Sequence, residues 1–192
     1  MKLNYKQLSD TAYALHQQQQ FDKAEKLYLQ LLTMQPEDSN VLNLLGLLYI
    51  SKKQEEKAIK YLTKAFILKK TPYIASNLAK AYYFNNEYAN ALKIFNDALS
   101  LQPSEDIYYS IALTYKKMHK YAEAIENYNN ALKYNKDNYK TYYNLSLAYK
   151  ELNDYDNALL NAEKSALLCD TDEEVYTLLS GYYEQKKIII VH

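Results

Sequence analysis

The sequence predicts an all-helical protein built from tandem helical hairpins. Five alanines recur with gaps of 33 or 34 residues, at Ala24, Ala58, Ala91, Ala124 and Ala158. The 192 residues include only two glycines and three prolines, too few for the many tight turns of an all-β fold. A period of this length indicates a repeat array in which each unit contacts only its neighbours.

Each repeat carries two apolar frames, one for each helix of a hairpin. In the first frame, residues such as Leu42 and Tyr49 recur at helical spacing and form one apolar face. In the second frame, small residues such as Ala58 cover that face and let the two helix axes approach closely. The matching first frame of the last unit consists of Tyr176, Leu179 and Tyr183, which we expect to face inward.

The two frames divide the chain into units. Pro36 and Pro103 end the first and third units because a proline ring prevents a helix from continuing. Pro72 opens a first helix, a position that proline tolerates. The expected units are residues 5–38, 39–71, 72–104, 105–138 and 139–172, followed by a partial or capping helix at 173–187.

The pattern resembles the tetratricopeptide repeat, a helix-turn-helix unit of about 34 residues. The shared features are a large residue, Leu, a small residue and Tyr in the first frame, then Ala and an aromatic residue in the second. The resemblance covers nearly the whole chain. It implies one right-handed α-solenoid of antiparallel helix hairpins across residues 1–192, with about five units and a terminal helix.

Composition argues against several classes of partner and location. Lys and Arg number 23 and Asp and Glu also 23, so no net field favours nucleic acid. No apolar run is long enough to span a bilayer, so we expect no membrane insertion. The lone Cys169 cannot form an internal disulfide and the first 20 residues lack a signal-peptide pattern, which favours a cytoplasmic location.

The residues that catalysis or metal binding would need are not clustered in the sequence. His16, His119 and His192 lie far apart, and none has a second ligand at metal spacing. Gly46 and Gly181 stand alone, so there is no glycine-rich loop for phosphate. We therefore expect no enzymatic activity of these residues, no cofactor and no metal.

A second face of the first helices is free to meet a partner. In the tetratricopeptide repeat this face lines a concave groove that holds an extended peptide or a helix. Tyr82, Tyr108 and Tyr142 are expected on the core face, whereas Tyr83, Tyr109 and Tyr143 are expected in the groove. The candidate groove residues are Tyr13, Asn43, Asn77, Lys80, Tyr83, Tyr109, Lys116, Lys140, Tyr143, Asn144 and Lys150.

The polar members of this set suggest the kind of partner. Asn77 and Asn144 share one repeat position, and their amides can hold an extended backbone without reading its side chains. This incomplete row is similar to the asparagine ladder of repeat arrays attached to sugar-transferring enzymes. The lysines favour an acidic segment, although charged residues on a helix are commonly just a solvated face.

These features support a non-catalytic scaffold that binds a peptide or protein segment in the groove. One alternative is the substrate-presenting arm of a larger enzyme, such as a glycosyltransferase, with its catalytic part beyond His192. Another is self-association through the array ends. The apolar run from Ile188 to Val191 motivates the first alternative, because such runs tend to aggregate when exposed.

Overall fold

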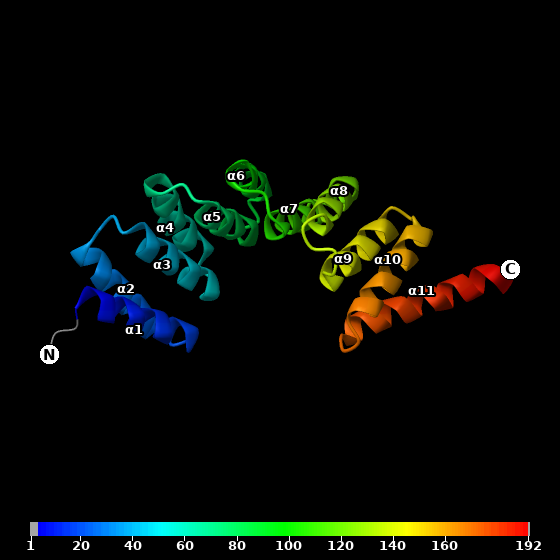
Figure 1. Ribbon diagram of the computed structural model, residues 1–192, viewed down its shortest axis with the longest axis horizontal. Helices are drawn as coiled ribbons and strands as arrows, with labels where there is room; N and C mark the ends of the chain where they lie inside the picture. Colours follow the sequence, from blue (N-terminus) through cyan, green and yellow to red (C-terminus); the bar gives the residue numbers. More distant parts are fainter. Residues whose placement is uncertain (1–3, 192) are drawn as a thin grey trace. The chain divides into compact units, whose positions relative to one another are not determined.

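The structure, a computed structural model, describes residues 4–191, with side chains described for residues 4–184. The described residues form helices and no strand, so the predicted all-α class is confirmed (Figure 1). The helices are α1 (Tyr5–Gln17), α2 (Phe21–Met34), α3 (Ser39–Ser51), α4 (Glu55–Leu68), α5 (Pro72–Phe84), α6 (Tyr88–Leu101), α7 (Glu105–Lys117), α8 (Tyr121–Leu132), α9 (Tyr139–Glu151), α10 (Tyr155–Leu168) and α11 (Glu173–Val191).

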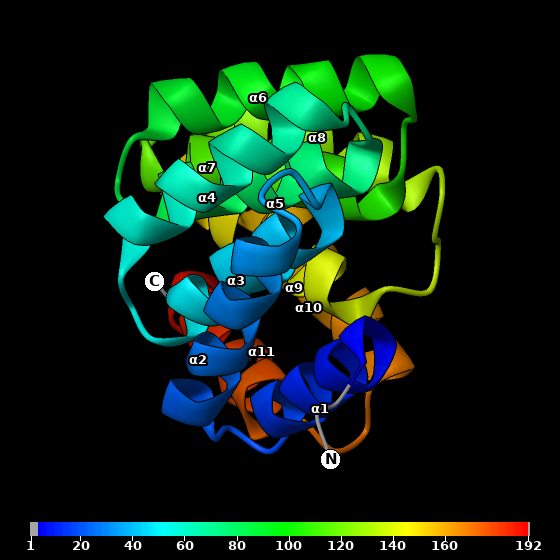
Figure 2. The ribbon, with the colours of Figure 1, turned by 90° about the vertical axis from the view of Figure 1, so that its left-hand side faces the viewer.

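The helices fall into two compact units, Met1–Gln102 (unit 1) and Pro103–His192 (unit 2). Unit 1 contains the hairpins α1/α2, α3/α4 and α5/α6, and the last two lie side by side in both views (Figure 1, Figure 2). Unit 2 contains α7/α8 and α9/α10, with α11 packed on α10. The odd-numbered helices α1 to α9, called first helices below, begin at Tyr5, Ser39, Pro72, Glu105 and Tyr139.

A side-chain cap starts every first helix. The hydroxyl of Ser104, for example, accepts a hydrogen bond from the backbone N–H of Ile107, one of the donors that a helix start leaves without an internal partner. A residue of the same capping class recurs at each repeat. The caps are Asn4, Asp38, Thr71, Ser104 and Asn138.

Each hairpin turn contains a residue in the left-handed conformation. At Lys53 (φ 55°), the backbone N–H donates to Ile50 O, and the next N–H, of Gln54, donates to Tyr49 O, both at 2.9 Å. These two bonds define a Schellman motif, which ends one helix and turns the chain into the next. The same conformation and bonds recur at Gln19, Asn86, His119 and Asn153.

The recurring alanines are fully buried at the contacts between paired helices, as the period predicts. In unit 1, α3 and α4 approach each other closely: a Cβ added to Gly46 would lie 2.4 Å from Leu62 Cγ. In both units a tyrosine completes the core. Tyr28 and Tyr128 have no exposed surface, and burial raises the pKa of Tyr28 to about 12.

The expected inward face of the last helix is wrong by one residue. Val175 and Tyr182 are the buried residues of α11, whereas Tyr176 and Tyr183 are exposed. Tyr182 packs with Ala158 and Ala162 of α10, and its hydroxyl hydrogen-bonds Ser146. Because Tyr182 and Tyr183 are adjacent, the sequence fits either one on the inward face. The pattern expects a large residue one turn or more earlier, which favours Tyr176 over the smaller Val175.

The helix α11 also continues beyond the predicted end at Lys187, to Val191. The side chains of the apolar run Ile188–Val191, and all of His192, lie outside the described residues.

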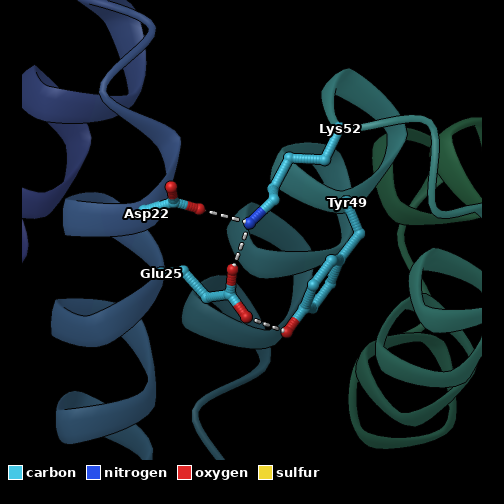
Figure 3. A network of polar contacts seen from close by, with 4 residues as sticks. All are labelled: Asp22, Glu25, Tyr49 and Lys52. Carbon is cyan, nitrogen blue, oxygen red and sulfur yellow. Dashed lines mark hydrogen bonds and ion pairs between the residues drawn. The ribbon is translucent and has the colours of Figure 1, made fainter.

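A polar network ties the first hairpin to the second within unit 1 (Figure 3). Lys52 Nζ, just after α3, lies 2.7 Å from Asp22 Oδ1 and 2.7 Å from Glu25 Oε2, both on α2. Tyr49 donates its hydroxyl to Glu25 Oε1 at 2.7 Å. Burial alone would raise the pKa of Glu25, but the hydrogen bonds from Lys52 and Tyr49 outweigh it, so that this pKa is lowered.

Candidate functional site

The predicted groove residues lie on the first helices of both units, and each unit is described by itself. In unit 1, Tyr13 on α1 is about half exposed, and Lys80 and Tyr83 on α5 are half-buried. Tyr83 packs edge-on against Phe84 and lies 5.8 Å from the ring of Tyr88, on the next helix of its own hairpin. Burial, and then Tyr88, raise the pKa of Tyr83. This tyrosine therefore belongs partly to the packing of the α5/α6 hairpin.

Two asparagines of unit 1 bond to each other. Asn43 on α3 and Asn77 on α5 are both buried, and Asn77 Nδ2 donates to Asn43 Oδ1 at 2.9 Å. The bond crosses between successive first helices. One oxygen and one N–H of this pair thus stabilise the array, because a buried amide must be satisfied by hydrogen bonds.

A pocket of about 230 Å³ opens beside this asparagine pair in unit 1. Tyr73, at the start of α5, lines this pocket and is 60% exposed. Lys69 and Thr71 come from the connection between α4 and α5, so the helical spacing of the sequence could not identify them as pocket residues. The pocket is lined by Asn40, Asn43, Leu44, Lys69, Thr71, Tyr73 and Ile74.

In unit 2 the corresponding asparagine is the centre of a larger network. Asn144 is only 8% exposed. Its Nδ2 donates to the hydroxyl of Tyr109 at 2.9 Å and to Lys140 O at 2.8 Å, and its Oδ1 accepts from Lys116 Nζ at 2.6 Å. Both N–H groups and one lone pair of the amide are therefore used within the protein.

Tyr109 contacts both the core and a surface pocket, so the tyrosines do not divide cleanly into core and groove residues as expected. Its ring lies 5.7 Å from that of the fully buried Tyr128, while its hydroxyl bonds Asn144. Tyr108 and Tyr142, expected in the core, are only half-buried; Tyr108 stacks on the exposed Tyr134. Tyr82 is likewise half-buried against the core of unit 1.

The lysines of unit 2 have different surroundings. Lys116 is half-buried, and desolvation followed by the charge of Lys117 lowers its pKa. Lys140 and Lys150 are exposed, with their Nζ atoms 5.8 Å from the ring of Tyr139 and 6.0 Å from the ring of Tyr182. Cation–π contacts of this kind are weak at exposed sites.

A second pocket, of about 190 Å³, lies between the first helices of unit 2 and the start of α11. Tyr139, Asp172 and Glu174 are lining residues that the sequence analysis missed. A usable signal existed, since Tyr139 opens a unit and the two carboxylates open the next helix. The lining is Tyr109, Tyr139, Lys140, Tyr143, Asn144, Asp172 and Glu174.

Two kinds of feature are not found in the part of the chain that the structure describes. Its His, Cys, Asp and Glu side chains form no group of three or more that could hold a metal ion. Its helices include none that is both long and apolar enough to cross a membrane.

Comparison with known proteins gives a consistent result at the level of fold. Family models described as tetratricopeptide repeat match residues 10–73, 74–105, 105–138 and 139–170. No curated protein is similar enough in sequence to be matched.

Solved structures share the fold at low sequence identity. MamA is 23% identical, with a TM-score of 0.77, over 85% of this chain and 91% of its own. A tetratricopeptide repeat protein from Parabacteroides merdae is 19% identical, with a TM-score of 0.81, over 95% and 73%. YrrB, described as having an unusual peptide-binding site, is 14% identical, with a TM-score of 0.73, over 96% and 92%.

Proposed function

The chain belongs to the tetratricopeptide repeat family, and from this we propose that it is a non-catalytic scaffold that binds an extended peptide or protein segment on its first helices. The observation that carries the proposal is a pocket between successive first helices in each unit. Each pocket combines tyrosine with a buried asparagine, and tyrosine is enriched at binding hot spots.

The sizes and positions of the two pockets suit side chains of an extended segment. They measure about 230 Å³ and 190 Å³, below the roughly 300–1,000 Å³ of sites for drug-sized ligands. Both lie toward the starts of first helices, beside Tyr73 in unit 1 and Tyr143 in unit 2. We expect each to receive one side chain of a partner segment.

The family and a structural relative support the same proposal. Tetratricopeptide repeats are generally non-catalytic scaffolds, and YrrB is described as having a peptide-binding site. Because YrrB is only 14% identical to this chain, the similarity extends to the fold alone. The proposal therefore rests on the two pockets of this chain.

The proposal can be tested with a displayed library of random linear peptides selected on the wild-type protein. The affinities of the selected peptides are then measured for Tyr73→Ala, which alters the unit 1 pocket, and Tyr143→Ala, which alters the unit 2 pocket. We expect at least one of these variants to bind about tenfold more weakly, the effect of losing about 1.4 kcal/mol of contact energy.

Control variants remove exposed apolar side chains from α4 and α10, each of which is the second helix of its hairpin. Ile67 on α4 is 72% exposed and Leu167 on α10 is 87% exposed, so Ile67→Ala and Leu167→Ala remove surface side chains outside both pockets. They should leave the affinity unchanged. The proposed face would be contradicted if both tyrosine variants bound the peptides with wild-type affinity, or if only the control variants lost affinity.

A further inference from the structure

We propose that the unit 2 pocket receives a positively charged side chain, lysine or arginine, of the bound segment. This inference rests on the proposed function and deepens it by naming the chemistry of one anchor. It also reverses, at this point of the surface, the acidic partner that the lysines of the sequence suggested.

Three tyrosines give the pocket an aromatic lining. Tyr109 comes from α7, and Tyr139 and Tyr143 from α9. The face of a tyrosine ring attracts a cation through its quadrupole. The protein already uses one of these rings in this way, since Lys140 Nζ lies 5.8 Å from the centre of Tyr139.

Two carboxylates at the start of α11 make the lining net negative. Asp172 and Glu174 face one lysine, Lys140, among the lining residues. Neither carboxylate forms an ion pair with another described residue. Their charges reach the pocket, because burial and then the negative charges of Glu174 and Asp172 raise the pKa of Tyr143.

The asparagine of the pocket offers nothing to an anion. Both N–H groups of Asn144 are donated, to Tyr109 and to Lys140 O, and the nearby Lys116 directs its ammonium to Asn144 Oδ1. Lys116 itself does not line the pocket. A carboxylate entering here would therefore meet two like charges, Asp172 and Glu174, against the one ammonium of Lys140, and would find both N–H groups of Asn144 already donated.

Arginine fits this combination of groups better than lysine. Its planar guanidinium can stack on a tyrosine ring while its N–H groups bond a carboxylate. We therefore expect an arginine side chain to bind more tightly than a lysine side chain.

The unit 1 pocket provides an internal control. It lies at a similar place in the repeat, but its lining contains Lys69 and no carboxylate. A cation that binds the unit 2 pocket because of its carboxylates and tyrosines should therefore bind the unit 1 pocket more weakly.

The first experiment is an NMR titration of the full chain with two small probes, Nα-acetyl-arginine amide and Nα-acetyl-glutamate amide. We expect the arginine probe to shift the backbone amide signals of Tyr143 and Glu174 with saturation, and to leave those of Asn43 and Tyr73 nearly unchanged. Saturable shifts of the unit 2 signals by the glutamate probe, or none by either probe, would overturn the inference.

The second experiment changes the charge of the lining. Glu174→Gln should weaken arginine binding by about two- to fivefold, and Lys140→Met should strengthen it by a similar factor, the usual size of exposed charge interactions. Lys69→Met, in the other pocket, is the control and should change nothing. If the pocket were instead an anion site, Glu174→Gln would strengthen binding of the glutamate probe and Lys140→Met would weaken it.

The outcomes separate this inference from the proposed function. If Tyr143→Ala weakens the selected peptides but the arginine probe leaves unit 2 unshifted, the cation site is refuted and peptide binding stands. If the arginine probe binds but no library peptide does, the cation site stands and the proposed function fails.

Discussion

Single residues decide how closely the helices of this protein pack. Gly46 lies where α3 crosses α4, and a Cβ there would meet Leu62 Cγ at 2.4 Å, inside any normal contact distance. At Gly181, on α11, nothing beyond its chain neighbours and the backbone of its own helix lies within 4 Å of the equivalent point. The two glycines therefore have opposite structural roles, although in the sequence both simply stand alone in helices.

Alanine substitution should separate these roles. Gly46→Ala forces a shift of Leu62 or of a helix axis and should lower the free energy of unfolding by about 1–3 kcal/mol. Gly181→Ala adds a helix-favouring residue without a clash and should raise it by about 0.5–1 kcal/mol. Urea unfolding of both variants measures the difference. A neutral Gly46→Ala would mean that the helices adjust freely at this contact.

The sequence predicts the buried alanines of this protein but not the hydrogen bonds of its polar side chains. The buried alanines follow from their period, because only small side chains fit between closely packed helices. The bonds of Asn144 do not follow from it, because they depend on how far Lys116 and Tyr109 reach from the preceding first helix. Several predicted groove residues are for this reason already bonded within the protein.

Side-chain caps and Schellman turns define the ends of the helices, and polar contacts hold one hairpin against the next. The α2–α3 network joins Lys52 to two carboxylates whose pKa values are lowered, and the pKa of Lys52 is itself raised by these hydrogen bonds. Carboxylates with lowered pKa values stabilise the folded state above their usual pKa values of 3.8 and 4.5, and lose this effect as the pH falls. The lysine contributes fully below its usual 10.5.

Removal of the lysine charge should reduce both stability and its pH dependence. Lys52→Met should lower the free energy of unfolding at neutral pH by up to about 1 kcal/mol, the range for partly exposed pairs. It should also flatten the loss of stability between about pH 5 and pH 3. Lys93→Met, at an exposed position on α6, is the matched control. Superimposed pH curves for wild type and Lys52→Met would show that the network contributes nothing measurable.

Element boundaries were predictable where the period was clear and unpredictable where neighbouring residues offered two alignments. The five first helices each begin directly after a capping residue, whereas in α11 Tyr182 rather than Tyr183 lies in the core. Adjacent tyrosines are equally apolar to a pattern search. Only packing on α10 distinguishes them.

The complete chain divides into two compact units, Met1–Gln102 and Pro103–His192. The period continues from the first unit into the second, so a repeat pattern alone could not predict the division. In repeat proteins stability is approximately the sum of each repeat and its contacts with neighbours. The core clusters around Leu62 and around Tyr128 each contain residues of one unit.

A local change should therefore have a local effect. In native-state hydrogen exchange, Gly46→Ala should reduce the protection of α3 and α4 most, then that of α2 and α5, and should leave α9 and α10 nearly unchanged. The measurement compares protection factors in the full-length variant and the wild type. Equal loss of protection in every helix would show that the chain unfolds as one cooperative block.

The left-handed turn residues have a consequence for how such a protein can diverge. Gln19, Lys53, Asn86, His119 and Asn153 share one backbone conformation although their side chains differ in charge and bonding. The two hydrogen bonds of each turn, rather than a required side chain, hold the conformation. The tips of the hairpins can thus exchange one polar residue without a Cβ branch for another over evolutionary time while the pairing of the helices stays the same.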